Sequence, residues 1–353
     1  MAHTSLIARR RLLKAAVFQP QAPAVNRVVA QPVPRAVPQR RNQGRIAAAR
    51  TAPAAELDSA PDHLYRMVTG TIIDVSPHVV TIGDSARERR FTLTADAKAW
   101  RGAPLEPSAL RPGDEAIIRL VPSQDVIADR MWANIGRVCG TILESDGDYL
   151  LVAERSARRR RTILISPQAR GRVRVRFPNL RPGYLIDVIG TRQQDVLHAL
   201  IPAAPQPPYR GDRVIALERS PGGRPPEAIT GSAVWHDPAD EPYGVLGVLY
   251  PAVDPAAGCS EDAAAGAGGT QAFRELPYLA IGSALVVHNA CSNISWTLPV
   301  TGCAPTARLF NDRCLSCRTS PRGRVADLTI ASFVALGGEL ESGCFNATLT
   351  IGR

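Results

Sequence analysis

Short runs of alternating apolar and polar residues, separated by turns of proline and glycine, fill the middle of the chain. Apolar side chains at every second position are typical of strands with one buried face. The first four predicted strands lie at 71–75, 79–82, 91–94 and 115–120. Turn residues stand between them, as in Ser76-Pro77-His78. About five such strands in about 65 residues predict a small closed or partly open β-barrel.

The same pattern occurs twice, at an offset of 70 residues. Three landmarks of the first copy recur in the second: Gly70-Thr71-Ile72-Ile73 as Gly140-Thr141-Ile142-Leu143, Leu110-Arg111-Pro112-Gly113-Asp114 as Leu180-Arg181-Pro182-Gly183-Tyr184, and Gln124-Asp125-Val126-Ile127 as Gln194-Asp195-Val196-Leu197. Three matches at one spacing indicate a duplication. Each copy resembles the OB-like repeats of bacterial exported proteins, which implies one small barrel at 66–136 and another at 137–201.

Arginines 158–161 are the candidate ligand site within these repeats. OB folds bind oligonucleotides or oligosaccharides on one face, but single-strand binding also needs exposed aromatic rings. We interpret the run as a solvated hairpin balanced by Glu88 and Glu154. No specific nucleic-acid partner is predicted.

The flanking segments show no helical or strand period. Residues 1–62 are rich in alanine, proline and arginine, which predicts a disordered basic tail, and 202–231 has the composition of a linker. The chain has 42 basic and 32 acidic residues, but ten basic residues precede the first acidic one, Glu56. The remainder is therefore neutral (42 − 10 = 32 against 32), which excludes a uniformly basic nucleic-acid binder. Polyanion binding through the tail alone stays a third functional hypothesis.

The tail contains a candidate address. Arg9-Arg10-Arg11-Leu12-Leu13-Lys14 resembles the twin-arginine export signal. Only Ala15-Ala16-Val17-Phe18 follows before Gln19-Pro20, whereas an export signal has about 7–15 apolar residues. The motif is therefore either a degenerate signal or part of a solvated tail. No apolar run reaches the roughly 20 residues of a membrane-spanning helix. We expect an extracellular or cell-wall location, with a cytoplasmic one as the alternative.

Six of the seven cysteines lie in the last 95 residues: Cys259, Cys291, Cys303, Cys314, Cys317 and Cys344. An even number in a small β-rich segment predicts disulfides and an oxidising compartment, although the sequence does not choose the pairing. The seventh, Cys139, is expected to be a buried thiol. Zinc held by Cys314 and Cys317 with Cys291 and Cys303 is the less favoured alternative, because zinc sites more often use two close pairs. No metal or cofactor is predicted.

The last third of the chain has the motifs with the most chemical content. A predicted strand at 308–310 leads into Asn311-Asp312-Arg313-Cys314, and Gly323-Arg324-Val325-Ala326-Asp327-Leu328-Thr329 leads into a predicted helix at 331–336. Further matching elements are Leu276-Pro277, 281–287, Ser332-Phe333, Leu336-Gly337 and 346–351. These motifs resemble the double-psi β-barrel of expansins, barwin-like proteins and the RlpA family. The resemblance covers about 244–353 and implies such a barrel in a domain at 232–353.

The resemblance implies a polysaccharide groove with Asp327 as its essential polar group and Asp312 as its partner. Two carboxylates in one groove raise each other's pKa, and glycan cleavage uses such a pair. Tyr250 or Trp296 would stack on sugar, beside Arg313. The alternatives are structural: Asp312 caps a turn, and Asp327 is the N-cap of the following helix. The sequence departs from the family at Leu249, where a threonine is expected, and lacks a histidine before Leu276-Pro277.

The sequence therefore predicts a mainly β protein with a disordered N-terminal tail, two tandem OB-like barrels and a double-psi barrel. The leading functional hypothesis is an exported cell-wall protein whose last barrel binds, loosens or cleaves a polysaccharide such as peptidoglycan. If it is an enzyme, it is a glycan hydrolase or a lytic transglycosylase. The alternative is a non-catalytic structural or interaction protein that retains the barrel.

Overall fold

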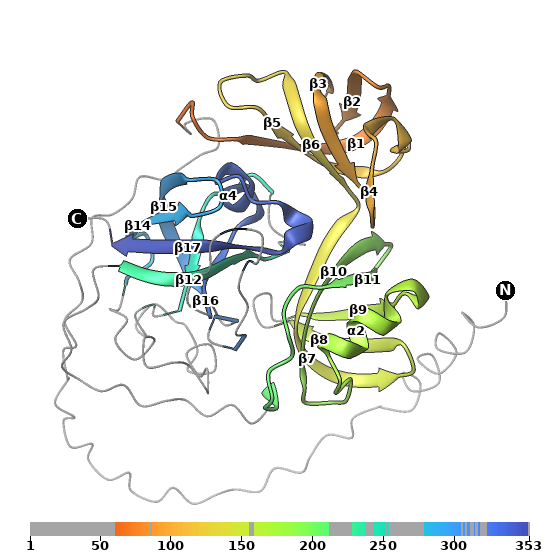
Figure 1. Cartoon of the computed structure of the whole chain (residues 1–353), viewed down its shortest axis with the longest axis vertical. Coiled ribbons are helices and arrows are strands. Elements are labelled where there is room, and N and C mark those ends of the chain that lie inside the picture. The colour runs from red at the N-terminus through yellow and green to blue at the C-terminus, as the bar shows by residue number, and fades with distance from the viewer. Residues whose placement is uncertain are drawn as a thin grey trace, which may run out of the picture. The chain divides into compact units, whose positions relative to one another are not determined.

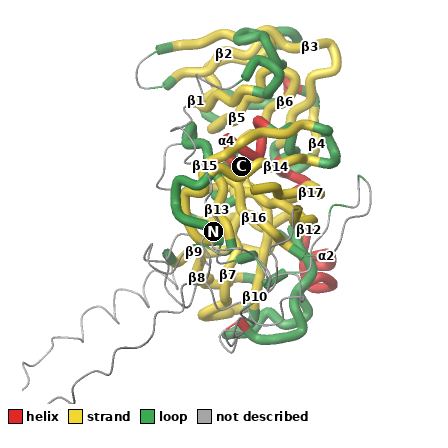
Figure 2. The backbone as a smooth tube through the Cα atoms, turned by 90° about the vertical axis from the view of Figure 1, so that its left-hand side faces the viewer, coloured by secondary structure: helices red, strands yellow, loops and turns green. Residues whose placement is uncertain are grey.

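The computed structural model describes most of the chain beyond the predicted tail. The described residues are 61–84, 87–154, 159–211, 228–237, 243–251, 253, 279–304, 306–307, 309–310, 314, 317 and 323–351. They form mainly strands, as predicted, with few and short helices (Figure 2). None of the helices in these ranges is both long and apolar enough to cross a bilayer.

The first repeat folds into a sheet closed on itself, drawn in orange and yellow in Figure 1. Its elements are β1 (Arg66–Val75), β2 (Val79–Gly83), β3 (Glu88–Trp100), β4 (Pro104–Leu105), β5 (Glu115–Leu120) and β6 (Ile127–Ala133). Strands β1, β2 and β3 form an antiparallel meander, β3 pairs in parallel with β6, and β5 lies between β6 and β1. This is the pairing of an OB fold, and the short β4 extends its edge.

The second repeat closes in the same order. Its elements are β7 (Ile135–Asp146), β8 (Tyr149–Glu154), β9 (Arg160–Ile165), α2 (Arg170–Arg176), β10 (Leu185–Gln193) and β11 (Val196–Pro202). Here β9 pairs in parallel with β11, and β10 lies between β11 and β7. Helix α2 occupies the connection that a 3-10 turn at Pro107–Ala109 occupies in the first repeat.

The duplication extends to irregular backbone. The pairing of β1 with β2 shifts register after Ile72, and that of β7 with β8 shifts after Ile142. In both repeats the Pro-Gly turn docks on this bulge, because Gly113 N donates to Ile72 O and Gly183 N donates to Ile142 O, each at 2.8 Å. Both turn glycines have φ near +90°, which residues with a Cβ rarely adopt. The two repeats therefore share backbone geometry as well as sequence.

The C-terminal region forms a third closed barrel, drawn in cyan and blue in Figure 1. Its elements are β12 (Ala228–Trp235), β13 (Val248–Tyr250), β14 (Ala284–Asn289), β15 (Ile294–Cys303), β16 (Arg324–Leu328), α4 (Ile330–Ala335) and β17 (Cys344–Ile351). The strand order is β12-β16-β13-β15-β14-β17, and both β12–β16 and β13–β15 are parallel pairs. Six strands with two parallel pairs agree with the predicted double-psi architecture.

Two boundaries differ from those predicted. Strand β12 begins at Ala228, inside the predicted linker 202–231, because Ala228–Val234 pairs in register with β17 and completes the barrel. The predicted strand at 308–310 is not one at its described positions: Leu309 lies in a turn and Phe310 in irregular backbone, and both pack in a small buried cluster with Leu185 and Ala204.

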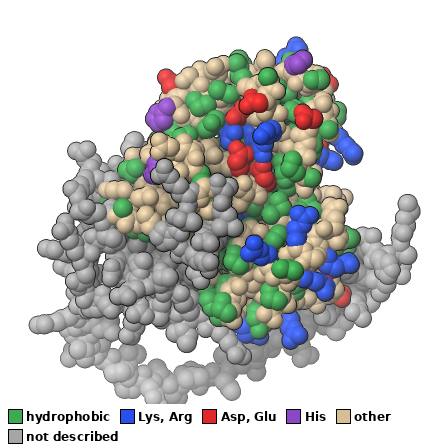
Figure 3. Space-filling view, viewed as in Figure 1, with side chains coloured by type: hydrophobic (Ala, Val, Ile, Leu, Met, Phe, Trp, Pro, Cys, Tyr) green, Lys and Arg blue, Asp and Glu red, His purple; other side chains and the backbone are tan. Residues whose placement is uncertain are grey.

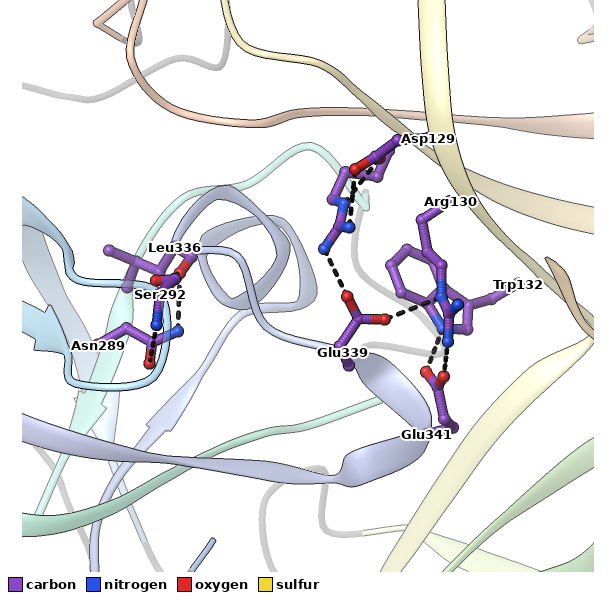
Figure 4. A network of polar contacts seen from close by, with 9 residues as sticks. Asp129, Arg130, Trp132, Asn289, Ser292, Leu336, Glu339 and Glu341 are labelled. Carbon is purple, nitrogen blue, oxygen red and sulfur yellow. Dashed lines mark hydrogen bonds and ion pairs between the residues drawn. The ribbon is translucent and has the colours of Figure 1, made fainter. Parts of the chain in front are cut away.

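Polar contacts join the first barrel to the C-terminal barrel (Figure 4). Arg119 Nη1 donates to Glu339 Oε1 at 2.9 Å, and Arg119 also forms a double hydrogen bond with Asp129 of β6. Arg130 pairs with both Glu339 and Glu341. A separate group in the figure closes the end of α4, where the side chains of Asn289 and Ser292 donate to Leu336 O.

Candidate functional site: a buried ion network and an open pocket

Asp327, the residue predicted to be essential, lies in β16 with 1% of its surface exposed. Thr306 Oγ1 donates to its Oδ2, while Oδ1 is buried and makes no hydrogen bond among the described residues. Burial raises the pKa of Asp327, and the nearby Arg324 guanidinium only partly offsets this. Asp327 is not the N-cap of α4: that position belongs to Thr329, whose side chain accepts from Ser332 N.

Asp327 is one end of a chain of buried polar groups that reaches into the second barrel. Arg324 Nη1 donates to Thr306 Oγ1 at 3.1 Å, and Arg324 Nη2 donates to Asp187 of β10. Arg137 of β7 forms a double hydrogen bond with Asp187, at 2.9 and 2.7 Å. We call Arg137, Asp187, Arg324, Thr306 and Asp327 the ion network. Each of its side chains is almost completely buried.

The ion network fixes the second barrel to the C-terminal barrel. Arg137 Nη1 donates to the carbonyl oxygens of Trp235, at 3.0 Å, and of Gly343, at 2.7 Å. Burial alone would raise the pKa of Asp187, but the two guanidinium groups outweigh it and lower that pKa to about 2. Asp187 is therefore charged at neutral pH and held between two arginines, whereas Asp327 is a carboxyl group for which burial disfavours the charge.

The space beside Asp327 is too small for a sugar. The cavity lined by Asp327, Arg324, Arg137, Cys139 and Trp235 has a volume of about 10 Å³. A single water molecule needs about 10–15 Å³ by the same measure. Groups from the second barrel, Arg137, Cys139 and Glu154, form part of its wall, so that barrel encloses the space beside Asp327.

Neither Tyr250 nor Trp296 lines this cavity. Tyr250 of β13 is fully buried in the core, so its ring offers no stacking surface. Trp296 of β15 is half-buried against the core cluster. Asp312 and Arg313 lie outside the described residues. Of the two predicted acidic residues, only Asp327 belongs to the described part of the chain.

The cysteines divide into groups. Cys291 and Cys317 form a disulfide with a Cα–Cα distance of 5.2 Å, and Cys303 is also disulfide-bonded. Cys314 and Cys344 are buried, and Cys259 lies outside the described residues. Cys139 is a half-buried thiol beside Arg324, and burial raises its pKa, which makes it a poor nucleophile.

A larger, open cavity of about 270 Å³ lies where the two repeats meet, and we call it the junction pocket. Its polar lining comprises Thr69, Thr71, Asp84, Glu115, Asn134, Arg192 and Tyr243. The first six belong to the two OB barrels and their junction, and Tyr243 comes from the segment between β12 and β13. Ligand sites are common at such interfaces between domains.

Asn134 builds the pocket, since it is the single residue between β6 and β7. It has a left-handed φ of +53°, a conformation that asparagine tolerates better than most residues. Its backbone forms a hydrogen bond with each repeat: Asn134 N donates to Glu115 O, and Arg192 N donates to Asn134 O, each at 2.7 Å. Its side chain accepts from Glu115 N at 2.9 Å and donates to Asp114 at 2.7 Å.

Arg192 and Tyr243 form the opposite wall of the junction pocket. Arg192 Nε and Nη2 both donate to Ile135 O, at 2.9 and 2.7 Å, which fixes the guanidinium plane. The guanidinium carbon, Arg192 Cζ, lies 5.7 Å from the centre of the Tyr243 ring. Burial raises the pKa of the Tyr243 phenol, so the hydroxyl stays neutral. An aromatic ring beside fixed donors and carboxylates is suited to a polyhydroxylated ligand. Sequence reasoning missed this pocket, because Tyr243 lies in no motif.

Comparisons with known proteins add little. The chain matches no protein-family model and no curated protein. Among solved structures it is similar to eukaryotic translation initiation factor 5A from Methanococcus jannaschii, with 18% sequence identity over 42% of this chain and 92% of that chain. The TM-score of that match is 0.15, which carries no argument about fold or function.

Proposed function

We propose that the chain is an exported, cell-wall-associated protein that binds a polysaccharide in the junction pocket and leaves its glycosidic bonds intact. The observation that carries this proposal is the contrast between the two cavities. The space at Asp327 holds about one water molecule, whereas the junction pocket has about 270 Å³ and a polar lining. That volume lies just below the range of about 300–1,000 Å³ for drug-sized ligands, so it suits about one sugar residue of a longer chain.

The chemistry of the junction pocket favours a neutral glycan. Asp84, Glu115 and Asn134 offer hydrogen-bond acceptors for sugar hydroxyl groups. The Tyr243 ring offers an apolar face for the C–H groups of a sugar ring. The disulfide-bonded Cys303, which is not part of the cysteine cluster around Cys314, supports an oxidising, exported location.

The test is retention of the purified chain on insoluble peptidoglycan, cellulose and chitin, compared with Tyr243→Ala. The matched control is Tyr149→Ala, since Tyr149 is a tyrosine of β8 with 41% exposure that does not line the pocket. We expect retention of the wild type and of Tyr149→Ala on at least one polymer, and loss for Tyr243→Ala. If the folded wild type binds none of the three polymers, the proposal is overturned.

Cleavage is tested in the same samples by mass spectrometry of released sugars. We expect none. Sugar release that disappears in Asp327→Asn would instead support the glycan-cleaving hypothesis. Sugar release that disappears in Glu115→Gln would instead assign the cleavage to the carboxylates of the junction pocket, Asp84 and Glu115.

A second candidate, binding of anionic polymers, is favoured by helix α2. Its four arginines, Arg170, Arg172, Arg174 and Arg176, are all exposed, and only Asp148 pairs with any of them among the described residues. Figure 3 shows Lys and Arg side chains gathered on the lower right of the described surface. This candidate predicts affinity for polyphosphate that falls steeply with salt and is lost when Arg172 and Arg176 are replaced by glutamine.

A further inference from the structure

Four cysteine side chains gather at one end of the C-terminal barrel. Cys291 follows β14 and Cys344 begins β17, and these strands pair with Asn289 opposite Ala347. Cys314 and Cys317 come from the connection before β16. The Sγ atoms of Cys291, Cys314 and Cys317 all lie within 4.8 Å of one another. Cys344 packs in the same cluster, with Cys314 and Cys317 beside Val234.

The three Sγ atoms of Cys291, Cys314 and Cys317 lie close enough together to begin a structural zinc site, and Cys344, which packs beside Cys314, is the candidate for the fourth ligand. Zinc takes four thiolates at about 2.3 Å in a tetrahedron, which places neighbouring sulfurs about 3.8 Å apart. A Cys-x-x-Cys pair commonly supplies two of the four ligands of such a site. Cys303, which the sequence suggested as a ligand, is disulfide-bonded instead, and Cys344 takes its place in the cluster.

A buried asparagine holds the Cys-x-x-Cys segment in position. Asn346 is 1% exposed, and its Oδ1 accepts from Cys314 N at 3.2 Å. Its Nδ2 donates to the carbonyl oxygens of Cys314 and Cys317, at 3.2 and 3.1 Å, and lies 3.4 Å from Cys317 Sγ. Hydrogen bonds of this kind to ligand sulfurs and their backbone orient the ligands of metal sites.

We propose that Cys291, Cys314 and Cys317 bind one zinc ion in the reduced chain, and that Cys344 moves toward them to become the fourth ligand. The Cys291–Cys317 disulfide is then the oxidised, metal-free state of the same centre. A phosphine converts one state to the other: it reduces the disulfide to two thiols and takes the oxygen of a water molecule to become the phosphine oxide. The four thiols release their protons as the zinc–sulfur bonds form. This proposal is independent of the junction pocket.

The experiment reduces the full chain with a phosphine, adds zinc chloride, removes unbound metal and measures zinc by elemental mass spectrometry. We expect about one zinc per reduced chain and none in the oxidised chain. Cobalt chloride in place of zinc should give the thiolate charge-transfer absorption of tetrahedral cobalt. Cys314→Ser and Cys344→Ser should each lower zinc retention at least tenfold, whereas Cys139→Ser, outside the cluster, should retain it.

A measurement without substitutions covers the case in which the serine variants do not fold. The native mass spectrum of the reduced wild type should show a zinc adduct that has lost the thiol protons. A reduced, folded wild type with no zinc adduct and no cobalt–thiolate absorption would overturn the proposal. Zinc retention by folded Cys314→Ser and Cys344→Ser equal to that of the wild type would overturn it as well.

Discussion

The two repeats have the same backbone fold, yet they carry different side chains at equivalent buried positions. Arg137 and Asp187 in the second repeat stand where the first has Met67 and Ile117, each 70 residues earlier. Met67 and Ile117 are buried apolar residues of the core. The second repeat has replaced this apolar pair with opposite charges that bind each other and the C-terminal barrel.

This difference between the repeats separates two polar regions of the described chain, a buried group of charges and an open cavity. The charged pair of the second repeat is part of the ion network, which covers Asp327 and leaves almost no space beside it. Within the described part of the chain, an open cavity lies at the junction of the two repeats, around Asn134. We interpret the ion network as an interdomain fastening and the junction pocket as the binding site.

The largest expected effect comes from breaking the ion network at its centre. Asp187→Asn leaves Arg137 and Arg324 buried with their main counter-charge removed, which typically costs about 3–5 kcal/mol. Asp148→Asn is the control, because Asp148 pairs with the exposed Arg170 and Arg174, and such pairs contribute about 1 kcal/mol or less. Urea unfolding measures both. A loss below about 1 kcal/mol for Asp187→Asn would refute the fastening role.

The pH dependence of stability gives a second test of the stabilising role of Asp187 in the ion network. The pKa of Asp187 is lowered from 3.8 to about 2 in the folded chain, so its contribution is complete above pH 4 and is lost as the pH falls toward 2. The difference in melting temperature between the wild type and Asp187→Asn should therefore be constant above pH 4 and narrow below it. A difference that stays constant down to pH 2 would contradict the assignment.

An intermediate effect is expected at the junction pocket. Tyr243→Ala should weaken glycan binding about tenfold, the equivalent of about 1.4 kcal/mol, because the ring contributes one face of the pocket. The unfolding midpoint should change little, since Tyr243 is only half-buried. Titration calorimetry with a soluble glycan fragment measures the first quantity. If Tyr243→Ala bound the glycan fragment as tightly as Tyr149→Ala, the ligand would not bind in the junction pocket.

The smallest effect is expected for Asp327→Asn. Burial raises the pKa of Asp327, so the folded chain binds a proton more tightly there than the unfolded chain. That contribution favours the fold at low pH and declines as the pH rises from about 4. Asp327→Asn should therefore match or exceed wild-type stability at pH 7, within about 1 kcal/mol. A loss of more than about 2 kcal/mol would show that the ionised carboxylate stabilises the network.

Local patterns predicted most of the fold. The repeat spacing and the Pro-Gly turns located both OB barrels, and the predicted helix at 331–336 is α4, one residue earlier. Arg159 pairs with Glu154, as predicted, but the prediction of a solvated hairpin is wrong at Glu154, which is buried. These features depend on neighbours in the sequence or on one repeated spacing, which a single sequence reveals.

Contacts between barrels could not be predicted in this way. A motif identified Asp327, but its exposure depends on Arg137 and Asp187 from another barrel, 190 and 140 positions away. One signal was available: the change from Met67 and Ile117 to Arg137 and Asp187 between the repeats indicates a paired exchange of apolar for charged groups. Tyr243 lies outside every repeat and motif, so only the fold brings it to the junction pocket.

The most direct test of binding without cleavage is one titration series with product analysis. Soluble fragments of the glycan that retains the chain are titrated into the wild type, Tyr243→Ala and Asp327→Asn, and each mixture is then examined by mass spectrometry. The proposed function predicts equal affinity for the wild type and Asp327→Asn, about tenfold weaker binding for Tyr243→Ala, and intact glycan in every mixture. Cleaved glycan with the wild type but not with Asp327→Asn would contradict it.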